Sequence, residues 1–209
     1  MRKSARYPFL TGVLAIGLSL PPAPGKAADF SDPTWPCIQR KVENLSVGLM
    51  WPHPVEPVDL ALETRQAVDG LVSRLVLRRL PVEDLAPAVA AFAKEHGHQP
   101  ALLGHVFSRA FDKLSGTRRK LISGIGEYSL KQIALAEKID AKRASMDELM
   151  AADSPDFDQV DALEEQLDWD ERIYTDRARS LTYVCESPVL IEKRLYTIAQ
   201  LLQTAIAED

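Results

Sequence analysis

Two cysteines carry the chemistry that is easiest to assign in this sequence. Cys37 and Cys185 are its only cysteines, and they do not form a Cys-x-x-Cys pair, so a thioredoxin-like dithiol is not expected. Before them come a basic start, a 12-residue apolar run at residues 9–20 and small residues at 25–27, the pattern of a secretory signal peptide. In exported proteins, two thiols that can pair are usually oxidised to a disulfide. We therefore predict a Cys37–Cys185 disulfide in a periplasmic or secreted protein that has lost residues 1–27.

The histidines are weak candidates for metal ligands. His96 and His98 flank a single glycine, and His105 follows about two helical turns later. Imidazole suits copper and zinc, but no thiol stands nearby in the sequence and Glu95 is the only adjacent carboxylate. We interpret these residues as surface or capping histidines and expect no metal and no other cofactor.

Carboxylates dominate residues 140–171, here called the acidic segment. It holds 12 acidic residues against Lys142 and Arg143. A calcium loop of the EF-hand type, started at Asp156, lacks glycine at its sixth position and ends on leucine, so that pattern fails. Two interpretations remain, a solvated helix face or a surface for a basic partner. Under the second interpretation, the residues that bind the partner are Asp153, Asp156, Asp158 and Asp161.

Residues 28–58, here called the strap, offer an alternative site. They contain five prolines, which disfavour helix, but also Trp35 and Trp51, which a disordered linker rarely carries. We predict an ordered, extended segment laid over helices, with a short helix at about 38–44. If the protein binds a small ligand or a metal, we expect the site beneath this strap, where four residues would converge: Trp35, Trp51, His53 and Tyr128.

Helical periodicity begins near Asp59, a plausible N-cap, and short helices are expected over residues 59–116. The first ends at Pro81, the second covers about 85–96, and the third starts at Pro100 and breaks or kinks at 115–117. The predicted inward residues are Leu60, Thr64 as a polar entry, Val68, Leu71, Val72, Leu75, Val76, Leu103, Val106, Phe107, Ala110, Phe111 and Leu114.

Residues 117–209 predict a long helical hairpin followed by a C-terminal helix. Inward positions recur in steps of four and three from 121 to 149, a heptad pattern, and residues 118–152 would span about 50 Å as a helix. The turn at 153–156 supplies an N-cap at Ser154, and Ser187-Pro188 should kink or restart the chain. Glycine at 124 and 126 should permit close approach of another segment. The seam predicted for the two helices comprises Leu121, Ile125, Tyr128, Gln132, Leu135, Ile139, Lys142, Met146 and Leu149, facing Val160, Leu163, Leu167, Tyr174, Ala178, Leu181 and Cys185, with Ile191, Leu195, Ile198, Leu202 and Ala205 in the last helix.

The predicted fold is therefore all-α, a small helical base with a long antiparallel, coiled-coil-like hairpin and an extended strap, in one mature domain of residues 28–209. Short turns make the two long helices antiparallel, so the acidic segment forms the hairpin tip. Without the signal, 21 basic and 30 acidic residues remain, which disfavours nucleic-acid binding. No later apolar run approaches 18 residues, so no membrane span is expected.

The function expected from these patterns is that of an interaction or scaffold protein, not an enzyme, because no catalytic motif is found. Its partner would be another periplasmic or envelope protein. The alternative is a periplasmic module that binds a small ligand or a metal beneath the strap.

Overall fold

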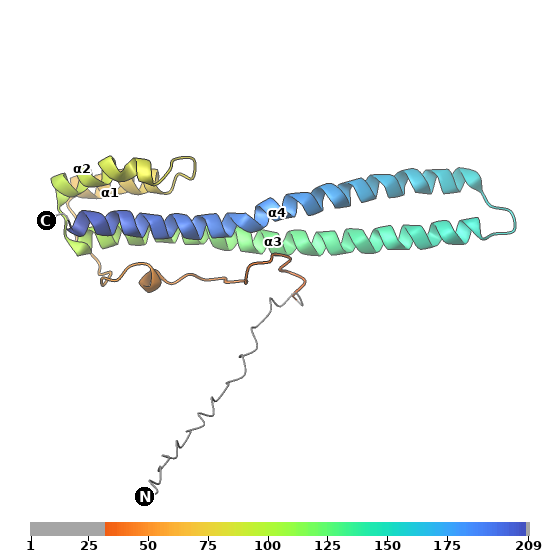
Figure 1. Ribbon diagram of the computed structural model, residues 1–209, viewed down its shortest axis with the longest axis horizontal. Helices are drawn as coiled ribbons and strands as arrows, with labels where there is room; N and C mark the ends of the chain where they lie inside the picture. Colours follow the sequence, from red (N-terminus) through yellow and green to blue (C-terminus); the bar gives the residue numbers. More distant parts are fainter. Residues whose placement is uncertain (1–31, 208–209) are drawn as a thin grey trace, which may run out of the picture.

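The computed structural model describes residues 32–207, so the predicted signal peptide lies outside the described residues. The described chain is all-helical and contains no strand. Two short helices, α1 (Leu62–Leu75) and α2 (Ala86–His96), precede two long ones, α3 (Pro100–Met150) and α4 (Phe157–Ala207). Figure 1 shows α3 and α4 side by side as a hairpin, with α1 and α2 packed at the end remote from its turn. The predicted fold class is confirmed, including the extended strap, which runs along the hairpin from residue 32.

The base of the molecule is a core shared by all four helices and the end of the strap. Ten of the 13 inward positions predicted for the short helices are at most 8% exposed, and the other three, Leu60, Thr64 and Val76, are half-buried. The ten buried residues pack against Ile191, Leu195, Ile198 and Leu202 of α4, which are at most 1% exposed. Trp51 adds an indole from the strap and stacks on Phe107, with ring centroids 5.2 Å apart. No helix among the described residues is both long and apolar enough to cross a membrane.

The first short helix begins later than the sequence predicts. Its N-cap is Ala61, not Asp59. Leu60 packs against the core, and its carbonyl accepts a hydrogen bond of 3.0 Å from Arg65 Nη2, so this residue precedes the helix and is not part of it. At the second helix, predicted at about 85–96, Pro87 lies in the first turn, and Gly97 follows the last residue with a φ of 115°, a conformation that favours glycine.

The break predicted at residues 115–117 does not occur, because α3 continues through it for 51 residues, about 75 Å. Ser115 Oγ donates to the carbonyl of Asp112 and Thr117 Oγ1 to that of Lys113, so both hydroxyls are satisfied within the helix. A glycine in a helix costs only about 1 kcal/mol. The third short helix and the first arm of the hairpin are therefore one element.

The second long helix also runs without interruption, although Pro188 lies inside it. The sequence predicted a kink or a restart there; the helix bends along its length in Figure 1 but does not restart. At its start, the N-cap is Asp156 and not Ser154. Asp156 Oδ1 accepts the backbone N–H of Gln159 at 3.2 Å, and the Gln159 side chain donates back to Oδ2 at 2.8 Å. This local pair fixes where the hairpin returns.

The seam between the long helices is apolar at both ends and polar in the middle. Every residue predicted for the α3 side is buried or half-buried, but Tyr174 and Ala178 on α4 are exposed, contrary to prediction. There, Tyr128 and Gln132 of α3 donate hydrogen bonds of 3.1 Å to the carbonyls of Arg177 and Tyr174. Because the side chains of Tyr128 and Gln132 contact the backbone of α4 here, the neighbouring side chains of α4, Tyr174 and Ala178, lie outside the seam.

Candidate functional site

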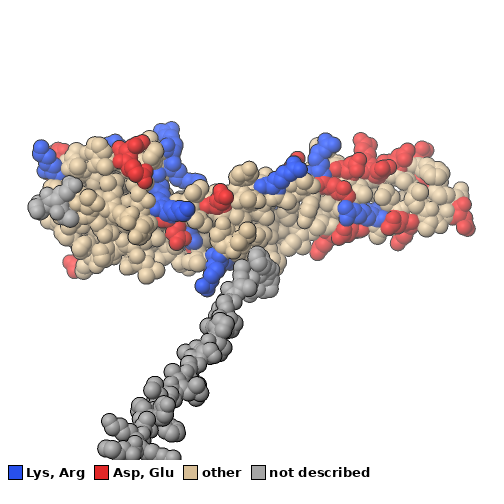
Figure 2. Space-filling view, viewed as in Figure 1, with Lys and Arg blue, Asp and Glu red and all other residues tan. Residues whose placement is uncertain are grey.

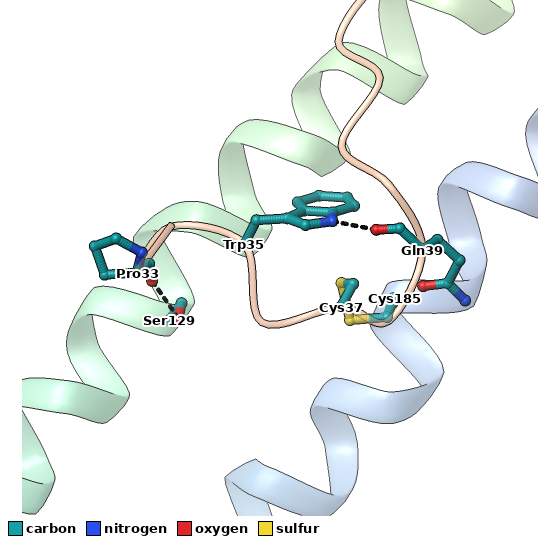
Figure 3. Close-up of a disulfide and its surroundings, with 6 residues drawn as sticks. All are labelled: Pro33, Trp35, Cys37, Gln39, Ser129 and Cys185. Atoms are coloured by element: carbon teal, nitrogen blue, oxygen red, sulfur yellow. Dashed lines mark hydrogen bonds between the residues drawn. A yellow bond between two sulfur atoms is a disulfide. The ribbon is translucent and has the colours of Figure 1, made fainter. Parts of the chain in front are cut away.

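The predicted disulfide joins the strap to α4 (Figure 3). The Cα atoms of Cys37 and Cys185 lie 5.5 Å apart, inside the limit of about 7 Å for a bridged pair. Both cysteines are buried in a small apolar cluster that also contains Trp35 and, from α3, Ile125. The bridge therefore holds the strap against both arms of the hairpin.

A close approach of backbones lets the strap cross α3 at Gly126. A Cβ added there would lie 3.3 Å from both the carbonyl oxygen and the Cβ of Thr34. Three residues later, Ser129 Oγ donates to the carbonyl of Pro33 at 2.7 Å. The predicted close approach of the strap is confirmed at Gly126, whereas Gly124 has no neighbour within 4 Å of such a Cβ.

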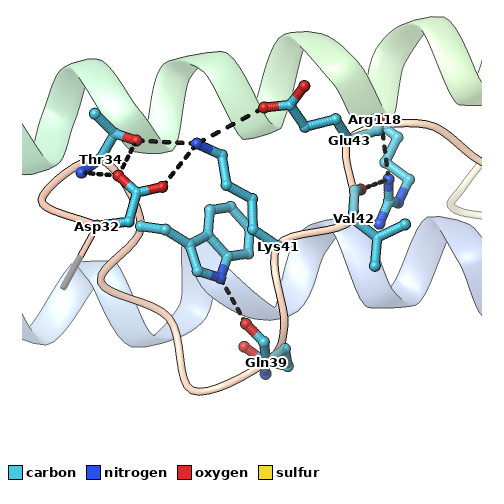
Figure 4. A network of polar contacts seen from close by, with 8 residues as sticks. Asp32, Thr34, Gln39, Lys41, Val42, Glu43 and Arg118 are labelled. Atoms are coloured by element: carbon cyan, nitrogen blue, oxygen red, sulfur yellow. Dashed lines mark hydrogen bonds and ion pairs between the residues drawn. The ribbon is translucent and has the colours of Figure 1, made fainter. Parts of the chain in front are cut away.

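A polar network fixes the start of the strap (Figure 4). Asp32 accepts hydrogen bonds from the Thr34 hydroxyl at 2.6 Å, the Thr34 amide at 2.8 Å and Lys41 Nζ at 3.0 Å. The hydrogen bond from the Thr34 hydroxyl, followed by that from Lys41, lowers the pKa of the Asp32 carboxyl to about 2. These bonds fold the strap back on itself. The short helix predicted at about 38–44 is absent; a 3-10 turn forms instead at Val47–Leu49.

Side chains occupy three backbone carbonyls in this part of the strap. The carbonyl of Gln39 accepts the Trp35 indole N–H at 2.5 Å (Figure 3). Arg118 of α3 reaches the carbonyls of Val42 at 2.5 Å and Glu43 at 3.4 Å from its Nη1 (Figure 4). A helix over 38–44 would need the Gln39 carbonyl for the backbone N–H of Glu43, and the Trp35 indole occupies that carbonyl instead.

Arg118 is a buried cation that the sequence analysis did not single out. It is 5% exposed, and its Nε has no hydrogen-bond partner. Its carboxylate neighbour, Glu192, lies 3.6 Å from Nη2 with a side chain 46% exposed. Burial lowers the pKa of the guanidinium, and the charge of Glu192 opposes that shift. The sequence did contain an indication that Arg118 is buried, since Leu114, Arg118 and Ile122 follow one another every four residues on one face of α3.

A groove of 650 Å³ lies between the strap and α4. Its apolar walls are supplied by the strap and by α4 next to the disulfide, and its charged groups are three cations and one carboxylate. The apolar lining comprises Trp35, Val42, Met50, Pro188, Val189 and Tyr196, and the charged residues are Arg40, Arg118, Glu192 and Lys193.

The four residues expected to converge beneath the strap do not form one site. Trp51 and His53 lie together, with ring centroids 5.7 Å apart, but Trp51 is 2% exposed and belongs to the base core. Trp35 belongs to the separate cluster around the disulfide. Tyr128 lies further along α3, with its hydroxyl bound to α4. Of the four, Trp35 lines the groove.

The histidines are placed as structural residues. His98 Nδ1 lies 2.7 Å from the carbonyl oxygen of Ala205, which makes Nδ1 the donor. His96 packs on Phe92, with ring centroids 5.0 Å apart. Burial and then the charge of Arg109 lower the pKa of His105. Within residues 32–207, no three His, Cys, Asp or Glu side chains lie close enough together to hold a metal ion.

The acidic segment lies at the hairpin tip, as Figure 2 shows. Three of its carboxylates are in ion pairs: Arg143 contacts Asp140 at 3.3 Å and Glu171 at 2.7 Å, and lysines contact Asp170. The other nine are exposed. Those nine are Asp147, Glu148, Asp153, Asp156, Asp158, Asp161, Glu164, Glu165 and Asp168.

One carboxylate of the tip has a structural role that its neighbours lack. Asp170 is 6% exposed and accepts contacts from Lys142 at 2.8 Å and Lys138 at 3.0 Å, both from α3. The hydrogen bond from Lys142, followed by that from Lys138, lowers the pKa of Asp170. Asp168 points outward, as expected for residues two apart on a helix. The steps of four and three from Leu163 through Leu167 to Asp170 mark Asp170 as a seam residue.

Two surfaces of the described chain therefore combine charge with apolar groups, the groove beneath the strap and the tip of the hairpin. No protein-family model matches this sequence, and comparison with curated proteins and with solved structures gives no match.

Proposed function

We propose that this protein is an exported helical interaction protein that binds another envelope or secreted protein through the tip of its hairpin. One observation carries the proposal: nine exposed carboxylates without ion pairs occupy the end of a hairpin that projects away from the helical base. The disulfide is compatible with an oxidising compartment, where such bonds persist.

The charge distribution favours a basic partner. Both cations of the acidic segment, Lys142 and Arg143, already contact carboxylates, so the remaining acids are not neutralised locally. At physiological salt their field extends about 8 Å. A field of that range steers an oppositely charged surface and raises the association rate more than it lengthens the life of the complex.

Apolar side chains at the same end would add contact area. Met150 ends α3 and is 51% exposed, and Phe157 begins α4 and is 62% exposed. Neither is needed for the seam, which closes at the tip through Val160, 8% exposed. Aromatic residues and methionine are enriched at the centres of protein interfaces, whereas the charged rim sets encounter rates.

The test is affinity purification of the tagged protein from its native host, with the wild type compared to a tip variant. Asp153, Asp158 and Asp161 are changed to lysine, and Asp156 is kept because it caps α4. We expect a basic protein to co-purify with the wild type and to be lost from the variant. With the purified partner, the association rate should fall and the dissociation rate should change little.

The matched control carries the same number of charge reversals at the base, at the exposed residues Glu56, Glu63 and Glu95. It should retain the partner, and circular dichroism should give the same helix content for both variants. Equal capture by the wild type and the tip variant at low and at physiological salt would contradict the proposal and leave the carboxylates as a solvated surface.

A further inference from the structure

We infer that the groove between the strap and α4 is a binding site for an amphipathic carboxylate, an apolar chain that ends in an anionic group. This site is separate from the hairpin tip and goes beyond the proposed partner binding. Its volume of 650 Å³ falls within the range of about 300–1,000 Å³ that is typical of small-molecule sites.

The shape of the groove suits an extended chain. Along α4 its wall runs from Cys185 to Thr197, thirteen residues that span about 18 Å of helix. Trp35 and Met50 form the facing wall on the strap, and both are anchored, Trp35 through Gln39 and Met50 through a 3.1 Å hydrogen bond from Gln203 to its carbonyl. The site is therefore preformed, which reduces the ordering cost of binding.

The charges of the groove select an anion. Arg40, Arg118 and Lys193 face a single carboxylate, Glu192, so the lining carries a net charge of +2 within a chain of net charge −5. Lys193 and Arg40 are exposed at the rim, where an incoming carboxylate would meet them first. A cationic amphiphile would meet repulsion from the same three residues.

Arg118 is the element that makes this a built site and not merely an apolar surface. Its guanidinium is almost fully buried: Nη1 donates to the carbonyls of Val42 and Glu43, Nε has no acceptor, and Glu192 stands 3.6 Å from Nη2, beyond strong hydrogen-bond distance. A buried cation with so weak a counter-ion is costly. A ligand carboxylate that reaches Nη2 would add a charge-assisted contact at the one end of the guanidinium where Glu192 stands too far away to supply it.

The experiment is isothermal titration calorimetry of the disulfide-bonded protein with dodecanoate, below its micellar concentration. Dodecyltrimethylammonium, which has the same chain length and the opposite charge, is the matched ligand. We expect saturable binding of one dodecanoate per chain and at least tenfold weaker binding of the ammonium amphiphile.

Two variants assign the binding to the groove. Lys193→Glu reverses an exposed rim charge and should weaken dodecanoate binding about tenfold, the change expected when one charge-assisted contact becomes repulsive. Val189→Trp fills the groove and should abolish binding. Arg179→Glu reverses an exposed charge on the same helix outside the groove and should leave the affinity unchanged.

Several results would overturn the inference. They are the absence of dodecanoate binding, equal affinity for the two amphiphiles, and binding that neither groove variant alters. If dodecanoate fails to bind but Lys193→Glu lowers capture of a protein partner, the groove belongs to that protein and not to a small molecule. The tip variant should bind dodecanoate normally, so failure of this inference is distinguishable from failure of the proposed function.

Discussion

Gly104 and Gly124 lie on the same helix but in opposite surroundings, so alanine at each position should change stability in opposite directions. At Gly104 an added Cβ would lie 3.0 Å from Trp51 Nε1 and 3.4 Å from Cε2 of the same ring. The indole is 2% exposed and stacks on Phe107 with an interplanar angle of 18°, so it has no free direction in which to move. At Gly124 the new Cβ would meet nothing within 4 Å.

The magnitude follows from two contributions. Replacing glycine by alanine in a helix interior stabilises the fold by about 1 kcal/mol at either site. At Gly104 the added methyl group also overpacks the core, which typically costs roughly 1–3 kcal/mol. Gly124→Ala should therefore gain about 1 kcal/mol, whereas Gly104→Ala should lose up to about 2 kcal/mol.

Urea unfolding followed by circular dichroism measures both free energies, and the slopes of the transitions should match those of the wild type. Because the two variants share the propensity gain, their difference isolates the contact with Trp51. Equal transition midpoints would refute the reasoning, since they would mean that Trp51 does not press on Gly104 as the structure shows. Near-ultraviolet dichroism should change for Gly104→Ala alone.

Two further predictions concern the strap. The double variant Cys37→Ala, Cys185→Ala should be less stable by roughly 2–5 kcal/mol in urea, because the chain-entropy model gives about 5 kcal/mol as an upper figure for a bridge across 148 positions; a loss below 1 kcal/mol would contradict this. Asp32 has a folded-state pKa of about 2 against an ordinary 3.8, so its contribution to stability is complete above pH 3.8 and is lost as the pH falls toward 2. Asp32→Asn should flatten that part of the stability profile, and an unchanged profile would speak against the network around Thr34 and Lys41.

Local patterns in the sequence were enough to predict where most of the helical residues lie and which of them face inward at the base. Steps of three and four place Val68, Leu103 and Leu195 inward whatever partner each helix finds, because a helical face is set by 3.6 residues per turn. All three are fully buried. The disulfide could also be predicted from the sequence, since two cysteines leave only one intramolecular pairing.

Helix continuity was harder to predict, because signals for breaks act locally and tertiary packing outweighs them. In a helix interior Gly116 costs about 1 kcal/mol and Pro188 about 3 kcal/mol, yet both lie inside 51-residue helices. Around Gly116 the helix gains the burial of Leu114 and Arg118, and around Pro188 that of Cys185 and Ile191. Sequence propensity does not contain these long-range contacts.

The candidate sites divide in the same way. The sequence by itself determined that residues 140–171 are strongly acidic and belong to helices joined by a turn, because charge and periodicity are local properties. Only the tertiary structure decided that Asp170 is buried beneath Lys138 and Lys142 while nine other carboxylates stay exposed. Likewise, it decided that Trp35 and Trp51 lie in separate clusters, and that Arg118 reaches carbonyls 75 and 76 positions away. Such placements depend on which chain segment packs against which, and a pattern within one helix carries no record of its partner.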